Sequence, residues 1–372
     1  MGKANSRLRL LTVFVLITAI TTSAIGFVYL QYFLPQKTNS DSLPYITKTQ
    51  SIFEPVLPNV PVKLPEDFSL HGQYQHELWH YFAMLEDDRG EKYSLQWTYI
   101  RIATDDRESK GWQEPHLYIS YAVIANETET WREQRLARGG IGQAGFSHKP
   151  FHLWIDNWNL TSSSQAPFPG HLSLISDTFD LQLNITSSAP CVLPGDKGYV
   201  ENYPLLSVAS YNLACPFLKV EGDIKLGKKG LTYVEGQGWI SKEWGTGLIR
   251  PVSKHMDWFT FNLDHETVLS VTRYSQSTTS AHWRGELYRI DGQVLSLLPQ
   301  GVSIQPTEFS FLTGGKRIPT KWRVVVKELG IDLVISAIDN DFWLPFVIPY
   351  WQGPIRASGS HEASGFMLLM GY

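Results

Sequence analysis

The stretch YVEGQGWISKEWGTG, residues 233–247, places Trp239, Lys242, Glu243 and Trp244 among four glycines. Glycine has no side chain, so a neighbouring backbone or a ligand can approach closely. One interpretation is a tight barrel corner with aromatic packing. The other is the wall of a site, in which Glu243 is the acid or base and the two indoles clasp an apolar substrate. The residues alone leave both interpretations open.

An alternation with a period of two continues outward from this stretch and predicts strands over most of the chain after residue 65. Residues 93–102 and 179–186 alternate most clearly, and residues 322–335 predict a hairpin that turns at Leu329-Gly330. The best candidate for a helix is the segment 127–138. Many antiparallel strands joined by short turns are typical of barrels and sandwiches.

The composition is that of a globular protein with an unusual number of aromatic residues. The chain has 372 residues, of which 43% are hydrophobic and 18% charged, and it contains 13 Trp, 17 Tyr and 18 Phe. This length predicts about two domains. Aromatic side chains are common in strands and line cavities for apolar ligands. The net charge of −4 argues against a nucleic-acid partner, which would need a basic surface.

The first 30 residues have the pattern of a membrane anchor. Lys3, Arg7 and Arg9 precede an uncharged run from Leu10 to Leu30, which is long enough to cross a bilayer. Because positive charges remain in the cytoplasm, we expect a single-pass protein of the cell inner membrane with its bulk in the periplasm. Cleavage as a signal peptide, followed by secretion, is the alternative. Residues 31–64 are rich in Pro, Ser, Thr and Asn and predict a linker.

Two cysteines and three histidines raise the questions of a disulfide and of a metal. Cys191 and Cys215 are the only cysteines, and in an exported protein such a pair is expected to form a disulfide. His76 and His80 would lie about 13 Å apart along a strand, too far to share an ion, so His71 and these two predict no metal site. The sequence has no phosphate-binding or dinucleotide-binding motif, and we expect no cofactor.

Several polar residues lie beside tryptophans. A carboxylate that indoles shield from water has a raised pKa and can act as an acid near neutral pH. Glu77 and Glu243 both have a tryptophan within two positions and are the candidate catalytic residues. The alternative is that Arg101 and a glutamate pair as a buried structural strut.

Six segments, in this order, carry a resemblance to a known family. They are ELWHYFAMLEDDRGEKYSLQWTYIR (77–101), EQRLARGGIGQAGFSHKPFHLWIDNWNL (133–160), VLPGDKGY (192–199), GQGWISKEWGTG (236–247), DWFTFNL (257–263) and YWQGPIRASGSHEASGFMLLMGY (350–372). Together they resemble the AttH-like proteins, which are related to carotenoid 1,2-hydratases and are often described as predicted secreted hydrolases. The resemblance extends from about Leu64 to the last residue.

This resemblance implies an all-β fold of two tandem lipocalin-like (calycin) β-barrels, which would follow the N-terminal transmembrane helix predicted above. We place the barrels at residues 65–245 and 246–372. It also implies an apolar, often isoprenoid-like, ligand near the junction of the barrels. The hydratase relatives protonate a carbon–carbon double bond, which requires a positioned acid and aromatic faces that stabilise a cation. The ligand-binding residues that it implies are Trp79, Gln96, Arg101, Trp239, Trp244, Asp257, Trp258, Tyr350 and Trp351.

Five polar positions depart from the family pattern. Ser241 replaces an expected aspartate, which in the hydratase relatives is a leading candidate for the proton donor. Tyr121 replaces a histidine, Gln352 and Leu368 replace glutamates, and His80 replaces a tyrosine. The departures and the anchor favour a protein that binds a hydrophobic molecule for a membrane complex such as an ABC-type transporter. The alternative is a hydrolase or hydratase that uses general acid catalysis.

Overall fold

The computed structural model describes most of the chain after residue 52. Within these residues no helix is both long enough and apolar enough to cross a membrane. The anchor predicted over residues 1–30 lies outside the described part of the chain, as do residues 31–52 of the linker. The described ranges are 53–105, 111–203, 208–247, 255–275, 281–312, 315–339 and 342–372.

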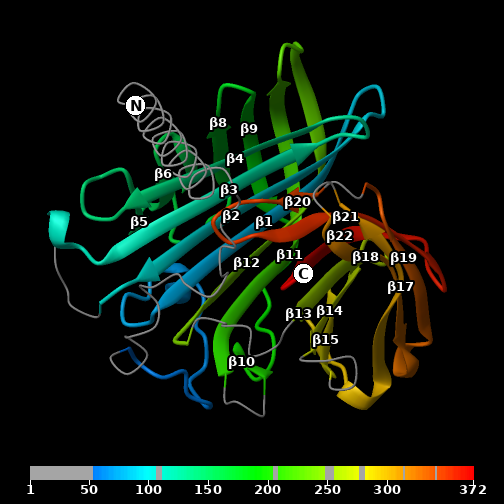
Figure 1. The fold of residues 1–372 in the computed structure, drawn as a ribbon. Helices are drawn as coiled ribbons and strands as arrows, with labels where there is room; N and C mark the ends of the chain where they lie inside the picture. The colour runs from blue at the N-terminus through cyan, green and yellow to red at the C-terminus, as the bar shows by residue number, and fades with distance from the viewer. Residues whose placement is uncertain are drawn as a thin grey trace, which may run out of the picture. The chain divides into compact units, whose positions relative to one another are not determined.

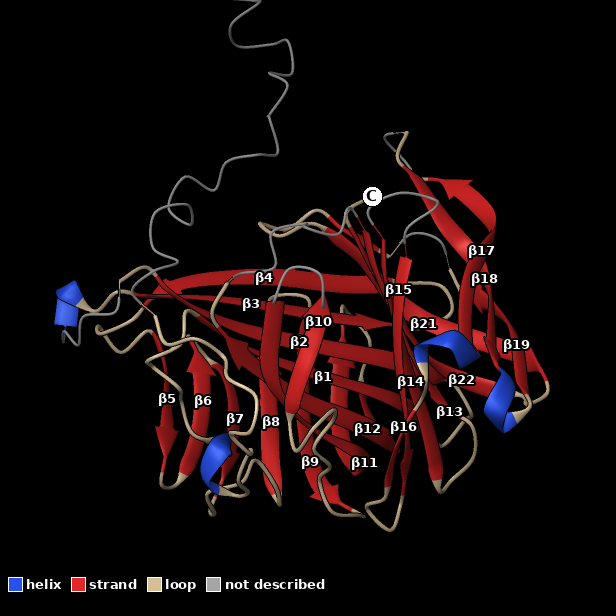
Figure 2. Ribbon diagram, turned by 90° about the horizontal axis from the view of Figure 1, so that it is seen from below, coloured by secondary structure: helices blue, strands red, loops and turns tan. Residues whose placement is uncertain are grey.

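Nearly all regular structure is strand, and the helices are single 3-10 turns (Figure 2). The first sheet has 12 strands among the described residues, in the order β4-β3-β2-β1-β12-β11-β9-β8-β7-β6-β5, with β10 paired to β11. Its strands are β1 (His76–Asp87), β2 (Lys92–Ala103), β3 (His116–Ala125), β4 (Thr130–Arg138), β5 (Ala144–His148), β6 (Phe151–Ile155), β7 (Trp158–Ser162), β8 (Gly170–Ile175), β9 (Phe179–Ser187), β10 (Tyr199–Tyr203), β11 (Val208–Leu226) and β12 (Leu231–Gly245).

The second sheet has 10 strands in the described ranges, in the order β16-β15-β14-β13-β22-β21-β19-β18-β17, with β20 paired to β21. Its strands are β13 (His255–Asn262), β14 (Thr267–Ser275), β15 (Ala281–Arg289), β16 (Val294–Ser296), β17 (Val302–Phe311), β18 (Arg317–Val326), β19 (Ile331–Ala337), β20 (Trp343–Leu344), β21 (Tyr350–Gly359) and β22 (Ala363–Met370). The 3-10 turns are η1 (Glu66–Phe68), η2 (Gly111–Gln113), η4 (Pro299–Gly301) and η5 (Lys327–Leu329). The predicted all-β architecture of two barrel-like sheets is confirmed (Figure 1).

The predicted hairpin forms in the expected register, but the predicted helix does not form. Trp322 pairs with Ile335 and Val326 with Ile331 across the β18–β19 turn. Residues 130–138 of the expected helix form strand β4 instead, and Leu136 pairs with Ile119 of β3. Because β4 lies at the edge of its sheet and buries only Ala137 fully, its sequence lacks the apolar alternation of a buried strand.

Strand β12, which contains the 233–247 stretch, lies between β1 and β11. A Cβ atom at Gly236 would be 2.0 Å from the backbone oxygen of Met84, so only glycine allows this approach of the two strands. The even-numbered residues Ile240 and Trp244 enter the interior of the first sheet, while Trp239 belongs to a separate cluster between the sheets. Alternation along β12 therefore divides the stretch between the interior and the junction of the two sheets.

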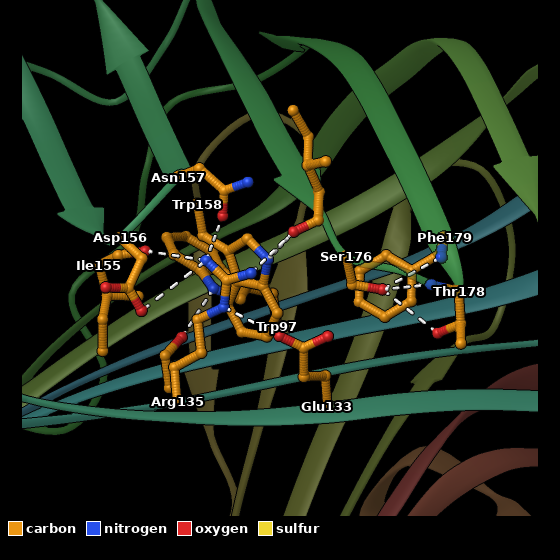
Figure 3. A network of polar contacts seen from close by, with 12 residues as sticks. Trp97, Glu133, Arg135, Ile155, Asp156, Asn157, Trp158, Ser176, Thr178 and Phe179 are labelled. Atoms are coloured by element: carbon orange, nitrogen blue, oxygen red, sulfur yellow. Dashed lines mark hydrogen bonds and ion pairs between the residues drawn. The ribbon is translucent and has the colours of Figure 1, made fainter.

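Arg135 of β4 connects the edge of the first sheet to its opposite end (Figure 3). Its guanidinium lies 4.1 Å from the centre of the Trp158 ring and donates to the carbonyl oxygen of Ile175 at 2.7 Å. It also donates to Asn157 and, at 3.0 Å, to Glu133. Since β4 and the β5–β8 strands are at opposite ends of the strand order, these contacts draw the sheet toward a closed barrel.

The last residues of the predicted linker pack on the first sheet. Phe53 and Val62 are buried, although residues 53–64 contain no strand. The backbone N–H of Leu57 donates to the Tyr211 hydroxyl at 3.0 Å, and the N–H of Val62 donates to the Lys197 carbonyl at 2.9 Å. This part of the expected 31–64 linker is therefore attached to the fold.

A disulfide joins the loop after β9 to strand β11. The sulfur atoms of Cys191 and Cys215 are bonded, and their Cα atoms are 4.2 Å apart. Next to the disulfide, Val192 forms an isolated bridge with Ala214. The disulfide thus fixes the loop that precedes β10 against the first sheet.

Candidate ligand site between the two sheets

Strand alternation separates the site residues predicted from the sequence into three places. Glu77, Trp79, Arg101 and Trp244 point into the first sheet, where the two tryptophans belong to its core. Asp257 and Trp351 lie inside the second sheet. The remaining members lie at the junction of the sheets; they are Gln96, Trp239, Glu243, Trp258 and Tyr350.

Glu77 lies in a buried charge network inside the first sheet. Its Oε1 is 2.7 Å from Lys242 Nζ, and both side chains are almost completely shielded from solvent. The backbone N–H of His71 donates to Glu77 Oε2 at 2.9 Å, and Arg101 Nε lies 3.9 Å from the same oxygen. Lys242 also donates to the backbone oxygens of Asp67, at 2.8 Å, and Ser69. The network therefore attaches the segment before β1 to the interior of the sheet.

These contacts favour the strut over the acid for Glu77. Burial alone raises the pKa of Glu77, but Lys242, His71 and Arg101 together hold it below its usual value. A carboxylate held in its ionised form has no proton to donate. Trp79 and Trp244 contact the same network, with Lys242 Nζ 5.1 and 4.9 Å from their ring centres. These contacts favour a structural role for Glu77, Trp79 and Trp244 around Lys242.

Asp257 is buried inside the second sheet, away from the junction. Its carboxylate accepts hydrogen bonds from Tyr372 at 2.7 Å and from Arg273 at 3.2 Å. Burial raises the pKa of Asp257 to about 7, against the lowering effects of Tyr372 and Arg273. The residue connects β13 to β14 and to the C-terminal Tyr372.

Two cross-strand rows of the first sheet face the second sheet. One row runs Ser241–His80–Thr98–Tyr121 across β12, β1, β2 and β3, and the next runs Trp239–Phe82–Gln96. Each residue is two positions along its strand from its neighbour in the other row, so both rows occupy the same face. The first sheet thus presents imidazole, hydroxyl, amide and aromatic groups at the junction.

Two rows of the second sheet face them. Trp258, Leu368 and Gln352 form one row across β13, β22 and β21. Thr260 and Phe366 form the adjacent row. In Figure 1, β22 lies beside β1, as the contact between the Phe82 and Phe366 rings requires. The Trp239 and Trp258 rings likewise connect β12 to β13.

Aromatic rings join the two faces. The Phe82 ring centre is 5.0 Å from that of Phe366 and 5.3 Å from that of Trp258. The Trp239 ring centre is 6.2 Å from that of Trp258 and 5.5 Å from that of Tyr288 on β15. Such distances are those of favourable aromatic pairs. The rings form a continuous apolar surface with contributions from both sheets.

Polar atoms buried beside these rings lack partners within the described ranges of the chain. They are Gln96 Oε1, Trp239 Nε1, Thr260 Oγ1 and both terminal atoms of the Gln352 amide. Each of these side chains is more than nine-tenths buried. Buried polar groups are hydrogen-bonded in most proteins, so these atoms leave hydrogen-bonding capacity unused at the junction.

Glu243 lies at one end of the junction, within a polar cluster of both sheets. Burial raises the pKa of Glu243, while hydrogen bonds from Ser210 and Asn202 and the charge of Arg284 oppose the increase. Arg284 belongs to β15 of the second sheet and also contacts Glu286 at 3.3 Å. Glu243 is therefore the acidic candidate that the structure places at the junction. Its raised pKa means that it keeps its proton at a higher pH than an exposed glutamate does.

The sequence analysis did not assign Phe82, Thr260 or Phe366 to the site, and it noted His80 and Gln352 only as departures from the family pattern. The signal that could have identified them is strand alternation, because residues two positions apart along a strand lie on the same face. His80 and Phe82 are cross-strand neighbours of Ser241 and Trp239. The other departures, Tyr121, Ser241 and Leu368, also lie in the facing rows.

The fold and the junction define a protein of two tandem lipocalin-like sheets. The chain belongs to the AttH-like family, whose model matches residues 55–372. A solved structure from Nitrosomonas europaea named as an AttH is similar, with a TM-score of 0.76 and 23% identity over 86% of this chain and 100% of that chain. No curated protein matches the chain.

Two other solved structures share the fold at low identity. Kievitone hydratase from Nectria haematococca has a TM-score of 0.62 and 13% identity, over 86% of this chain and 95% of that chain. CghA, crystallised with Sch210972, has a TM-score of 0.50 and 9% identity, over 79% of this chain and 88% of that chain. These similarities concern the fold.

Proposed function

We propose that this protein binds a hydrophobic molecule, isoprenoid-like or ring-bearing, between its two sheets. Segment 10–30 would hold it in the cell inner membrane with the sheets in the periplasm, where it would serve a membrane complex such as an ABC-type transporter. The observation that carries the binding proposal is the aromatic surface formed by Phe82, Trp239, Trp258 and Phe366. Polar atoms without partners beside it, such as Trp239 Nε1, give the surface a means of orienting a ligand.

A binding measurement with a neutral apolar probe tests this proposal. The full chain in lipid nanodiscs is dialysed against N-phenyl-1-naphthylamine, with empty nanodiscs as the blank. We expect Trp239→Phe and Trp258→Phe to weaken binding roughly threefold to tenfold, because each loses ring contact at the junction. Trp112→Phe is the matched control, since Trp112 is 72% exposed. Binding that all three variants leave unchanged would contradict the proposal.

A hydratase is the second candidate, and the raised pKa of Glu243 at the junction favours it. Protonation of an alkene by the neutral Glu243 carboxyl would leave a carbocation, and attack by water would form the alcohol and return a proton to the Glu243 carboxylate. Aromatic rings of the junction, such as that of Trp239 on the same strand, would stabilise the cation. Incorporation of ¹⁸O from labelled water into squalene, an acyclic isoprenoid alkene, tests this reaction. Incorporation by the wild type that Glu243→Gln abolishes would support the hydratase. Probe binding without any ¹⁸O incorporation would support the binding protein.

A further inference from the structure

Two glutamines from different sheets meet at the centre of the junction. Gln96 of β2 and Gln352 of β21 are 3% and 1% exposed. The Gln96 Nε2 group donates to the backbone oxygen of Gln352 at 3.1 Å, which fixes the relative position of the two residues. This single bond leaves most of the hydrogen-bonding capacity of the two amides unused.

The unused groups include both donors and acceptors. Gln96 Oε1, Gln352 Oε1 and Gln352 Nε2 have no hydrogen-bond partner among the residues that the structure describes. A side-chain amide offers two N–H donors and a carbonyl acceptor. Leaving such groups buried without partners destabilises a fold, which is why they are uncommon outside functional sites. The unused donors and acceptors match a group that can both donate and accept.

The rows around the glutamines carry no formal charge near neutral pH. Thr98 and Ser241 contribute hydroxyls, and burial lowers the pKa of His80 to about 4, so that its ring is neutral. Charged groups do occur in the Glu243 cluster at one end of the junction, where Arg284 acts on Glu243 and pairs with Glu286. An ion placed among the rows around Gln96 and Gln352 would lose its hydration without meeting an opposite charge in those rows, which is strongly unfavourable.

We propose that Gln96 and Gln352 form a subsite for an uncharged hydroxyl or carbonyl group of the bound molecule, and that the junction rejects organic ions. The ring system of such a molecule would contact Phe82 and Trp258, whose rings lie 5.3 Å apart. The inference rests on the proposed function and adds the chemical class of the ligand. The ligand is a neutral, oxygen-bearing hydrophobic molecule.

Three probes that share one ring system separate this inference from the proposed function. Naphthalene, 1-naphthol and 1-naphthoate are dialysed at pH 7 against the full chain in nanodiscs, with empty nanodiscs as the blank. We expect 1-naphthol to bind roughly tenfold more tightly than naphthalene, because its hydroxyl satisfies buried amide groups. We expect 1-naphthoate to bind at least on the order of 100-fold more weakly than 1-naphthol, because its charge is desolvated.

The Gln352→Leu variant assigns the preference to the glutamine pair. It removes both unpartnered atoms of the Gln352 amide and leaves only Gln96 Oε1, so we expect the preference for 1-naphthol over naphthalene to shrink and the melting temperature to be unchanged or higher. Gln305→Leu, at an exposed position of β17, is the matched control and keeps the preference of the wild type. A lowered melting temperature with the preference intact would identify Gln352 as a structural residue and overturn the assignment.

The probe results also distinguish failure of the glutamine subsite from failure of the proposed function. If naphthalene and 1-naphthol bind equally, water alone satisfies the amides and the subsite is overturned, while the proposed function stands. If 1-naphthoate binds as tightly as 1-naphthol, the rejection of ions is overturned. If none of the three binds, the proposed function fails and the subsite fails with it.

Discussion

Phe82 and Phe366 stack with their ring centres 5.0 Å apart, although they belong to different sheets and are separated by almost the whole folded chain. This contact lies between the paired rows that face one another across the junction. Around it, both sheets bury polar atoms that find no partner in the described ranges. The junction therefore combines aromatic packing contributed by both sheets with unused hydrogen-bonding capacity. For that reason the proposed binding function is assigned to this surface.

The ion pair of Lys242 and Glu77 should contribute strongly to stability. Lys242→Met leaves a buried carboxylate without its nearest cation, so we expect the free energy of unfolding to fall by about 3–5 kcal/mol. Lys321→Met is the matched control, because Lys321 pairs with Glu308 at the surface, and we expect a loss below about 1 kcal/mol. Urea denaturation measures both. A loss at Lys242 no larger than at Lys321 would show that the network is not a strut.

Asp257 should make stability depend on pH near neutrality. Its pKa of about 7 in the fold exceeds the ordinary value of 3.8, so folding favours the protonated form. Stability should therefore fall as the pH rises from 3.8 to about 7 and change no further above it, and Asp257→Asn should remove this fall. Melting temperatures of both proteins over a pH series measure the effect. Parallel curves for wild type and variant would contradict it.

The folded unit should require residues 53–64 but not the residues before them. Removal of residues 1–52 should leave the melting temperature of the sheets unchanged. Removal of residues 1–64 also deletes the buried Phe53 and Val62, and it should cost about 3 kcal/mol or more. Equal melting temperatures for the two truncated proteins would show that the segment contributes nothing to the fold.

The disulfide should stabilise the loop between β9 and β11. Cys191 and Cys215 are 24 positions apart, and a loop of this size corresponds to about 3 kcal/mol in the chain-entropy model. We expect the double variant Cys191→Ala/Cys215→Ala to lose about this amount in urea denaturation. Thiol labelling of the unreduced, unfolded wild type should find no free cysteine, and two reactive thiols would refute the bond.

The sequence could predict the strands and the type of fold because alternation is a local property. The 93–102 and 322–335 patterns became β2 and the β18–β19 hairpin. Alternation could not show that both faces of β2 are buried. Gln96 and Thr98 would face solvent in an isolated sheet, and only the second sheet covers them. The location of the site therefore depends on the packing of distant segments.

The same limitation explains why the sequence could not show which candidate residues lie inside a sheet and which lie at the junction. Glu77 and Glu243 are both near tryptophans in the sequence, so proximity to indoles did not distinguish them. Glu77 is paired with Lys242, whereas Glu243 faces Arg284 of the other sheet. One residue step along β12 separates Lys242 from Glu243 and reverses the face. Their different roles follow from this step and not from the local composition.

A crystal structure of the full chain soaked with 1-naphthol tests the central claim most directly. The account predicts one molecule between the sheets, with its ring against Phe82 and Trp258 and its hydroxyl within hydrogen-bonding distance of the Gln96 or Gln352 amide. A probe bound only elsewhere, for example in the outer hollow lined by Thr161 and His171, would contradict the claim. A junction that stays closed at saturating probe would contradict it as well.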